Sequence, residues 1–231
     1  MKQFIIFAAF CGLMLTGCGQ ATQKGNKSQS PTDSIAAVIQ SNICQPEGVK
    51  ALLHYHRRYD AQQVQAWLAQ IPVELKDQAI ADLTLYYEVM EKTEKGKRYI
   101  DLVLQTPEGT EKKLSDYVSQ HTYTLLDFWV SGEGQERVQS QLRQLYRQYH
   151  AKGLEVVGVS LDTDATQWKK TIQELQLEWP QLTDLKGTQG VAYRQYTSIS
   201  AATSFLIDRQ GNIVSKFLSI EELEAKLKEL L

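Results

Sequence analysis

Two apolar segments separated by an amphipathic one constrain the fold of this chain more than any other feature. Residues 123–130 and 154–161 are almost continuously apolar, as is typical of strands buried on both faces of a sheet. Between them, residues 135–152 repeat apolar side chains at helical spacing, and Gly153 ends the pattern. A strand, a helix and a second strand in this order predict an α/β domain in which helices cover a sheet.

Flanking segments extend this domain over residues 99–231. Three of them have strand-like patterns. They are residues 99–105, 203–208 and 213–218. Three others have helical spacing. They are residues 114–118, 168–175 and 221–231. Because strands first alternate with helices and then form a hairpin, we predict a mixed sheet flanked by helices.

Residues 34–95 show helical periodicity and no strand pattern, so they predict a small all-helical region of three or four helices. The last of these helices is predicted as one amphipathic segment over residues 73–90. Its inner residues are predicted to be Leu75, Ile80, Leu83, Tyr87 and Met90. A charged linker, residues 91–98, then separates this region from the α/β domain.

The N-terminus has the composition of an export signal. One Lys precedes an apolar run over residues 4–15, which is too short for a membrane-spanning helix. The sequence LTGC at residues 15–18 resembles the lipobox of bacterial lipoproteins, in which the signal is cut before the Cys and the Cys carries lipid. The resemblance implies a signal peptide at residues 1–17, and a lipidated Cys18 with a flexible tether at residues 18–33. An ordinary cleaved signal with a chance Cys is the alternative.

This processing would leave the mature chain with an unusual cysteine content. The chain has three cysteines, Cys11, Cys18 and Cys44. Cys11 leaves with the signal and Cys18 carries lipid, so Cys44 stays without an intramolecular partner, whereas exported proteins commonly pair their cysteines. We interpret Cys44 as a small buried apolar residue, with a reactive thiol as the alternative.

Charge and histidine spacing argue against two classes of function. The formal net charge of −2 offers no broad basic surface, so we expect no nucleic-acid partner. His54 and His56 are two residues apart in a helical stretch and point to different sides, which favours a solvated face over a metal pair. No metal site and no cofactor are predicted.

The loop between the first apolar strand and its helix poses the main question of function. Gly132 and Gly134 resemble the start of a dinucleotide-binding loop, and Asp162 at the end of the next strand could face a ribose. However, Arg137 occupies the third glycine position, and two glutamates in the loop would direct negative charge at a diphosphate. The sequence therefore disfavours a dinucleotide site.

Five stretches of the C-terminal part carry a family resemblance. They are KLSDYV, YTLLDFWVS, LEVVGVSLD, WPQLTDLKG and SFLIDRQGNIV. Through them, residues 99–231 resemble the thioredoxin-like reductases of the bacterial cell envelope, which include the TlpA/ResA-type proteins and their alkyl hydroperoxide reductase/thiol-specific antioxidant relatives. The resemblance implies a thioredoxin-like mixed sheet flanked by helices, with thiol–disulfide exchange or peroxide reduction as the family activity.

The redox motif of this family, Trp-Cys-Gly-Pro-Cys-Arg, has lost both cysteines in this chain. Glu133 stands at the position of the first Cys and Glu136 at that of the second. Disulfide exchange requires a thiolate nucleophile and a second thiol that resolves the mixed disulfide, and a carboxylate can replace neither. We therefore expect no catalytic residue at this motif.

The remaining motif positions are partly retained. Gly134 and Arg137 match the family, whereas Gly132 replaces the Trp and Gln135 replaces the Pro. The cis-proline of the family corresponds to Ala202, where a cis bond would cost several kcal/mol. A trans bond and an altered groove are expected there.

Two roles remain open for the two glutamates. Acidic residues in a first helical turn stabilise the helix by offsetting its dipole, and Glu133 and Glu136 could do no more than that. Alternatively, they share a helix face at i, i+3 spacing and form an acidic patch that binds a partner or a cation. Two carboxylates alone make a weak metal site, which favours a partner.

We therefore predict a non-catalytic binding or scaffolding protein that is lipid-anchored in the bacterial cell envelope and faces the periplasm. Its membrane contact would be the lipid on Cys18, and its partner an envelope protein or peptide. The candidate residues of the binding groove are Trp129, Gly132, Glu133, Glu136, Arg137, Ala202 and Thr203. The alternative function is a thiol-disulfide oxidoreductase or antioxidant protein of the envelope.

Overall fold

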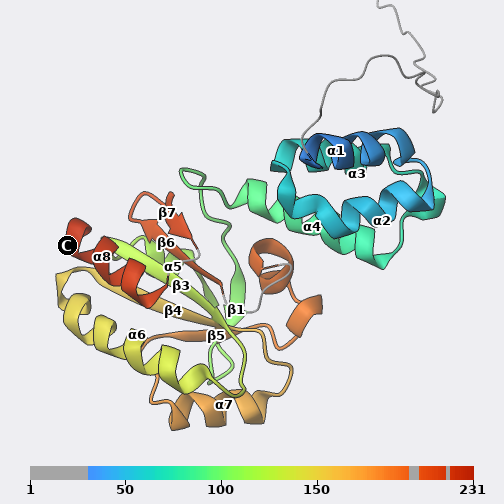
Figure 1. Ribbon diagram of the computed structural model, residues 1–231. Coiled ribbons are helices and arrows are strands. Elements are labelled where there is room, and N and C mark those ends of the chain that lie inside the picture. The colour runs from blue at the N-terminus through green and yellow to red at the C-terminus, as the bar shows by residue number, and fades with distance from the viewer. Residues whose placement is uncertain (1–30, 198–202, 217–218) are drawn as a thin grey trace, which may run out of the picture. The chain divides into compact units, whose positions relative to one another are not determined.

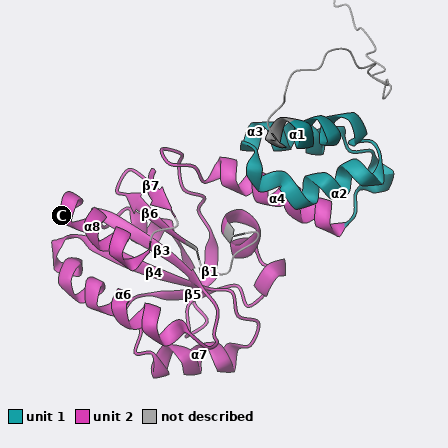
Figure 2. Cartoon of the chain, viewed as in Figure 1, with its two compact units in different colours: residues 1–77 teal, residues 78–231 magenta. Residues whose placement is uncertain are grey.

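The computed structural model describes residues 31–197, 203–216 and 219–231, and it divides into two compact units (Figures 1 and 2). The first unit comprises residues 1–77 and the second residues 78–231. In the described ranges, no helix combines the length and the apolar character needed to cross a bilayer.

The first unit is helical, with α1 (Pro31–Asn42), α2 (Pro46–Tyr55) and α3 (Ala61–Gln70), and with 3₁₀ turns at His56–Arg58 and Val73–Leu75. Its core consists of buried apolar side chains on all three helices and at the residues directly after α1 and α3. They are Ile39, Ile43, Val49, Leu52, Val64, Trp67, Leu68 and Ile71. Trp67 Nε1 donates a hydrogen bond to Gln40 Oε1 at 2.8 Å and joins α3 to α1. The predicted helical region is thus present.

The start of α1 differs from the predicted tether. The tether was expected to extend through residue 33, whereas α1 begins at Pro31. Proline suits a helix start because the first N–H groups of a helix have no intrahelical partner, so the missing donor costs nothing there. Residues 1–17, the predicted signal peptide, and Cys18 lie outside the described residues.

The helix predicted over residues 73–90 is divided in two. The 3₁₀ turn ends at Leu75, and α4 spans Gln78–Lys92, because Lys76 between them has an extended backbone with ψ of 93°. The prediction of inner residues is confirmed for Ile80, Leu83 and Tyr87, which are buried. Leu75 and Met90 are only half-buried, and Val89 is buried instead of Met90.

The boundary between the compact units also differs from the predicted boundary at residues 95–99. It falls between residues 77 and 78, so α4 belongs to the second unit. The physical reason is that α4 contacts η5, a π-helical segment at Tyr193–Thr197 of the sheet-containing unit.

The second unit is built on one sheet. Its described strands are β1 (Val103–Gln105), β2 (Glu111–Lys113), β3 (Tyr123–Trp129), β4 (Leu154–Ser160), β5 (Gln181–Thr183), β6 (Thr203–Asp208) and β7 (Ile213–Lys216). The strand order is β2-β1-β5-β4-β3-β6-β7 (Figure 1). β3 pairs in parallel with β4 and antiparallel with β6, and β6 pairs antiparallel with β7. The predicted mixed sheet is confirmed.

Helices lie against this sheet. The described helices of this unit after α4 are α5 (Ser115–Val118), α6 (Gln135–Tyr149), α7 (Ala165–Glu174) and α8 (Ile220–Leu230). Because side chains of a strand alternate between its faces, β3 contributes to two cores. Leu125 packs with residues of α6 and α8, whereas Leu126 and Phe128 pack with residues of α5 and η5.

Two strands have no counterpart in the prediction, and a third is shorter than expected. β2 consists of three exposed charged residues, and β5 has only three residues, so neither shows the periodicity of a strand. The strand expected over residues 99–105 is limited to β1. By contrast, the ends of β3 and β4 lie within one residue of their predicted ends.

Candidate functional site at the start of helix α6

The candidate site lies where β3 passes into α6. β3 ends at Trp129, and the connecting residues 130–134, which we call the α6 loop, end at Gly134, the N-cap residue. Gly134 has a φ of 86°, in the left-handed region that glycine adopts without steric cost. Gly134 has no side chain that could cap the first N–H groups of α6, and no side-chain cap of this helix is found among the described residues.

Asp162 holds the α6 loop in place. Its Oδ1 accepts a hydrogen bond from the Ser131 backbone N–H at 2.9 Å, and its Oδ2 accepts one from Ser131 Oγ at 2.8 Å. Ser160 Oγ, at the end of β4, donates to the same Oδ2 at 2.7 Å. The Asp162 carboxylate, which was considered as a ribose ligand, thus accepts hydrogen bonds from Ser131 and Ser160. Its role in the structure is to fix the loop.

The two glutamates differ in their relation to the helix. Glu133 precedes the N-cap residue, and only Glu136 lies in the first turn of α6. The expectation that both share one helix face is therefore wrong, because the left-handed residue Gly134 separates them. Both side chains are exposed, as is that of Arg137, and among the described residues neither glutamate forms an ion pair.

Trp129 is buried rather than exposed in an open groove. It is only 1% exposed, and its Nε1 donates to Gln181 Oε1 of β5 at 3.1 Å. Gln181 in turn lies over Gly158 of β4, where a Cβ atom would come within 2.2 Å of Gln181 Oε1. A partner could not reach Trp129 in this conformation.

The other predicted groove residues are incompletely described. Gly132 is exposed in the α6 loop, and Gln135 is half-buried at the first position of α6. Thr203 begins β6, where it pairs with Phe128. Ala202, at the position of the family cis-proline, lies outside the described residues.

A carboxyl group beside the site was not singled out from the sequence. Asp127 of β3 is half-buried, and its Oδ2 accepts a hydrogen bond from Gln139 Nε2 of α6 at 2.9 Å. Burial raises the pKa of Asp127 to about 6, and the hydrogen bond from Gln139 opposes the rise. The signal in the sequence is an Asp inside an otherwise apolar strand.

Gln139 is the only described group that donates a side-chain hydrogen bond to Asp127. Its side chain is 1% exposed, and its Oε1 has no hydrogen-bond partner among the described residues. If Asp127 were protonated and the amide turned over, Asp127 could donate to this oxygen instead. The pair can therefore satisfy either protonation state of the carboxyl group.

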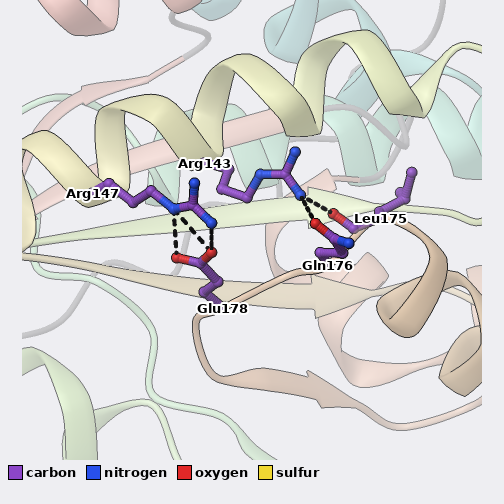
Figure 3. A network of polar contacts seen from close by, with 5 residues as sticks. All are labelled: Arg143, Arg147, Leu175, Gln176 and Glu178. Carbon is purple, nitrogen blue, oxygen red and sulfur yellow. Dashed lines mark hydrogen bonds and ion pairs between the residues drawn. The ribbon is translucent and has the colours of Figure 1, made fainter.

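Two arginines of α6 point toward the connection between α7 and β5 and hold it in place (Figure 3). Arg143 Nη1 donates to the Leu175 carbonyl oxygen at 3.1 Å and to Gln176 Oε1 at 3.0 Å. Arg147 Nε donates to both carboxylate oxygens of Glu178, at 2.9 and 3.1 Å, and Nη2 donates to Oε1 of the same carboxylate. This connection leads into β5, so the arginines help to place Gln181, the residue that accepts the hydrogen bond from Trp129.

The described residues contain no group of three or more His, Cys, Asp or Glu side chains that could hold a metal ion. His54 is exposed at the end of α2, and His56 begins the 3₁₀ turn that follows. The two histidines thus belong to different elements.

Cys44 departs from the expectation of an unpaired, buried thiol. It is only half-buried, its Sγ lies 3.9 Å from the Gln70 carbonyl oxygen, and it takes part in a disulfide. The other two cysteines of the chain lie outside the described residues. The expectation assumed that Cys11 leaves with the signal and that Cys18 carries lipid.

Together, the mixed sheet and the helix that follows β3 through the α6 loop define a thioredoxin-like protein. Residues 95–216 match the model of the AhpC/TSA family, and the chain belongs to that family. The fold and the family expected from the sequence are therefore confirmed.

Relatives with known names support this assignment. The thiol-disulfide oxidoreductase ResA of Bacillus cereus is 29% identical over 149 residues, which cover 63% of this chain and 83% of ResA. A solved thiol-disulfide oxidoreductase from Bacteroides fragilis is 30% identical, with a TM-score of 0.55, over 58% of this chain and all of that one. A thioredoxin-like protein from Bacteroides caccae, 18% identical, shares the fold over 86% of this chain and 76% of its own, with a TM-score of 0.63.

Proposed function

We propose that this chain is a lipid-anchored, thioredoxin-like protein of the bacterial cell envelope that binds a partner and does not catalyse disulfide exchange. One observation carries the proposal: the last cysteine of the sequence is Cys44, so the family domain contains no thiol at all. The motif positions at the start of α6 hold Glu133 and Glu136 instead.

The chemistry of the exchange reaction excludes these glutamates as substitutes. A thiolate attacks one sulfur of a disulfide, and a second thiol then resolves the mixed disulfide. A carboxylate forms no stable bond with the attacked sulfur, and neither glutamate can be oxidised to a disulfide. Loss of both cysteines therefore removes the nucleophile and the resolving group together.

The retained architecture of the site supports a binding role. Asp162 fixes Ser131, and the residues that follow present exposed charges, Glu133, Glu136 and Arg137, in a defined place. A surface that is held rigid loses little conformational entropy when a partner binds. The partner would be an envelope protein or peptide with a basic group opposite the glutamates.

Family membership favours a second candidate function. The named relatives are thiol-disulfide oxidoreductases, so the chain would be a redox or antioxidant protein of the envelope. In this case Cys44 would have to supply the reactive sulfur, although it lies in the helical unit, outside the family domain. The signal at residues 1–17 and the lipid on Cys18 belong to both candidates.

A redox assay on the purified protein separates the two functions. With dithiothreitol as reductant, we expect no acceleration of insulin reduction and no consumption of hydrogen peroxide above the rate of the Cys44→Ala variant. A Cys44-dependent turnover would contradict the binding proposal. The binding role is tested by a photoreactive amino acid placed at position 133 in cells, with Glu174 of α7 as the control position. We expect a defined crosslinked species from position 133 and none from position 174.

A further inference from the structure

An open cavity of about 630 Å³ lies within the second unit, between α4 and the segment that contains η4 (Gly187–Gln189) and η5. On the α4 side, its wall includes Gln78, Asp82 and Leu85. Their i, i+4 and i+7 spacing places them on one face of the helix. The volume is in the range of sites that hold small ligands, which is about 300–1,000 Å³.

Two opposite charges line this cavity from its two sides. Asp82 belongs to α4 and Arg194 to η5, and no ion pair joins them in the described part of the chain. Asp82 Oδ1 accepts a hydrogen bond from Gln78 Nε2 at 2.8 Å, which orients the carboxylate. Arg194 is exposed, and no side-chain hydrogen bond of its guanidinium is found among the described residues. Both charges are thus available to a ligand.

Neutral polar groups lie in the wall between these charges. Burial, and to a smaller extent the Asp82 carboxylate, raise the pKa of Tyr193, so the phenol stays neutral. Gln78 and Gln189 contribute amides, each of which can donate and accept hydrogen bonds. Leu85 gives the wall an apolar part. This combination suits a peptide backbone, which needs donors and acceptors in alternation.

We propose that the cavity binds a short peptide-like ligand that carries an ammonium group and a carboxylate group. The ammonium pairs with Asp82, and the carboxylate pairs with Arg194, whose planar guanidinium can bind both of its oxygens. The two charges can come from the ends of a free peptide or from Lys and Glu side chains within a longer one. The site contains no residue of the α6 loop, so its test does not depend on the proposed function.

Isothermal titration calorimetry of the full chain with the tripeptide Ala-Gln-Ala tests the proposal. The peptide is used with free ends, with an acetylated N-terminus, and with an amidated C-terminus. We expect the free peptide to bind and each blocked form to bind about three- to fivefold more weakly, as for exposed ion pairs. The blocked pentapeptide acetyl-Ala-Lys-Ala-Glu-Ala-amide tests whether side chains can supply the same charges.

Matched variants assign each end of the peptide to one residue. In Asp82→Asn, acetylation of the peptide should no longer weaken binding, whereas amidation still should. In Arg194→Gln, amidation should no longer weaken binding, whereas acetylation still should. Arg194→Lys should restore part of the binding, because it keeps the charge but not the planar fork. Arg57→Gln in the helical unit is the control for loss of one exposed positive charge. If neither the free tripeptide nor the pentapeptide binds at millimolar concentration, or if Asp82→Asn and Arg194→Gln leave binding unchanged, the proposal is overturned.

Discussion

Gln139 Nε2 of α6 donates a hydrogen bond to Asp127 Oδ2 of β3 at 2.9 Å, below the start of the helix. The pair joins the helix that follows the altered motif to an interior strand of the sheet. Near the candidate site, desolvation opposes the ionisation of Asp127, and Gln139 is its one side-chain donor among the described residues. Its titration should therefore be visible in the stability of the domain.

Replacing Asp127 with Asn should stabilise the protein at neutral pH. The pKa of Asp127 is raised from 3.8 to about 6 on folding, so the folded state binds more protons than the unfolded state between these values. Stability is therefore lost as the pH rises from about 4 to about 6, by up to about 3 kcal/mol in total. Asp127→Asn should remove this loss, so urea unfolding should show a clear gain at pH 7.5 and little gain at pH 4. The exposed Glu133→Gln is the control. An equal effect of Asp127→Asn at both pH values would contradict the prediction.

Loss of the Asp162 carboxylate should loosen the α6 loop. Asp162→Ala leaves the Ser131 N–H and Oγ without their acceptor, at an expected cost of about 1–3 kcal/mol in the free energy of unfolding. Hydrogen exchange should show faster exchange of the Ser131 amide, whereas the amides of β6 should be unchanged. Asp164→Ala, which removes the N-cap of α7, is a control of similar chemistry at another site. If Ser131 stays as protected as in the unaltered protein, the carboxylate does not fix the loop.

The two glutamates should differ in their effect on stability. Glu136→Gln removes a negative charge from the first turn of α6 and should cost about 0.3–1 kcal/mol. Glu133→Gln should cost less, because Glu133 lies outside the helix. Thermal unfolding at low salt measures the difference, and high salt should reduce it. Equal costs for the two changes would mean that the helix dipole is not the cause.

Recognition by the glutamates requires a separate measurement. The double variant Glu133→Lys, Glu136→Lys reverses two exposed charges and should abolish the crosslink to the envelope partner expected at the α6 loop. Here the photoreactive residue is placed at Gly132, because position 133 is changed. The charge-reversed pair Glu174→Lys, Glu224→Lys on α7 and α8 serves as the control. A folded double variant that still gives the crosslinked species at the same yield would rule out an acidic recognition patch.

The anchor is tested by Cys18→Ala, which should leave the protein unlipidated and release it from membranes. Mass spectrometry of the mature protein should find diacylglycerol on Cys18 as the first residue. Because Cys44 takes part in a disulfide in the structure, the same spectra report the state of Cys44 in the mature protein. A mature protein in which Cys18 is unmodified, or is joined to Cys44, would refute lipidation.

Much of the fold could be predicted because its central elements are long and periodic. β3, β4 and α6 bury one or both faces over seven residues or more, which leaves a clear pattern. β5 could not be found in this way, because its three residues are all buried and only Leu182 is apolar. The break before α4 depends on the backbone of Lys76, for which the sequence contains neither Pro nor Gly as a signal.

The sequence predicts the chemical groups of the candidate site but not their geometry. The absence of cysteines from residues 132–137 can be read from the sequence. The position of Glu133 outside the helix cannot, because it depends on the left-handed conformation of Gly134. Asp127 was missed because its strand was interpreted as a nearly continuous apolar run, although a carboxyl group in such a strand is a candidate for a shifted pKa.

The contact of Trp129, Gln181 and Gly158 has a consequence for any attempt to rebuild a redox motif on this scaffold. A side chain at position 158 would displace Gln181, and Trp129 would then lose the acceptor of its indole N–H. These three positions come from three different strands, so they should be inherited together in homologues and should covary when one of them changes. A designer who transplants a cysteine-containing loop between residues 130 and 137 should therefore transfer these three residues from the donor as well, since Gly158 of β4 and Gln181 of β5 hold the Trp129 that precedes the loop.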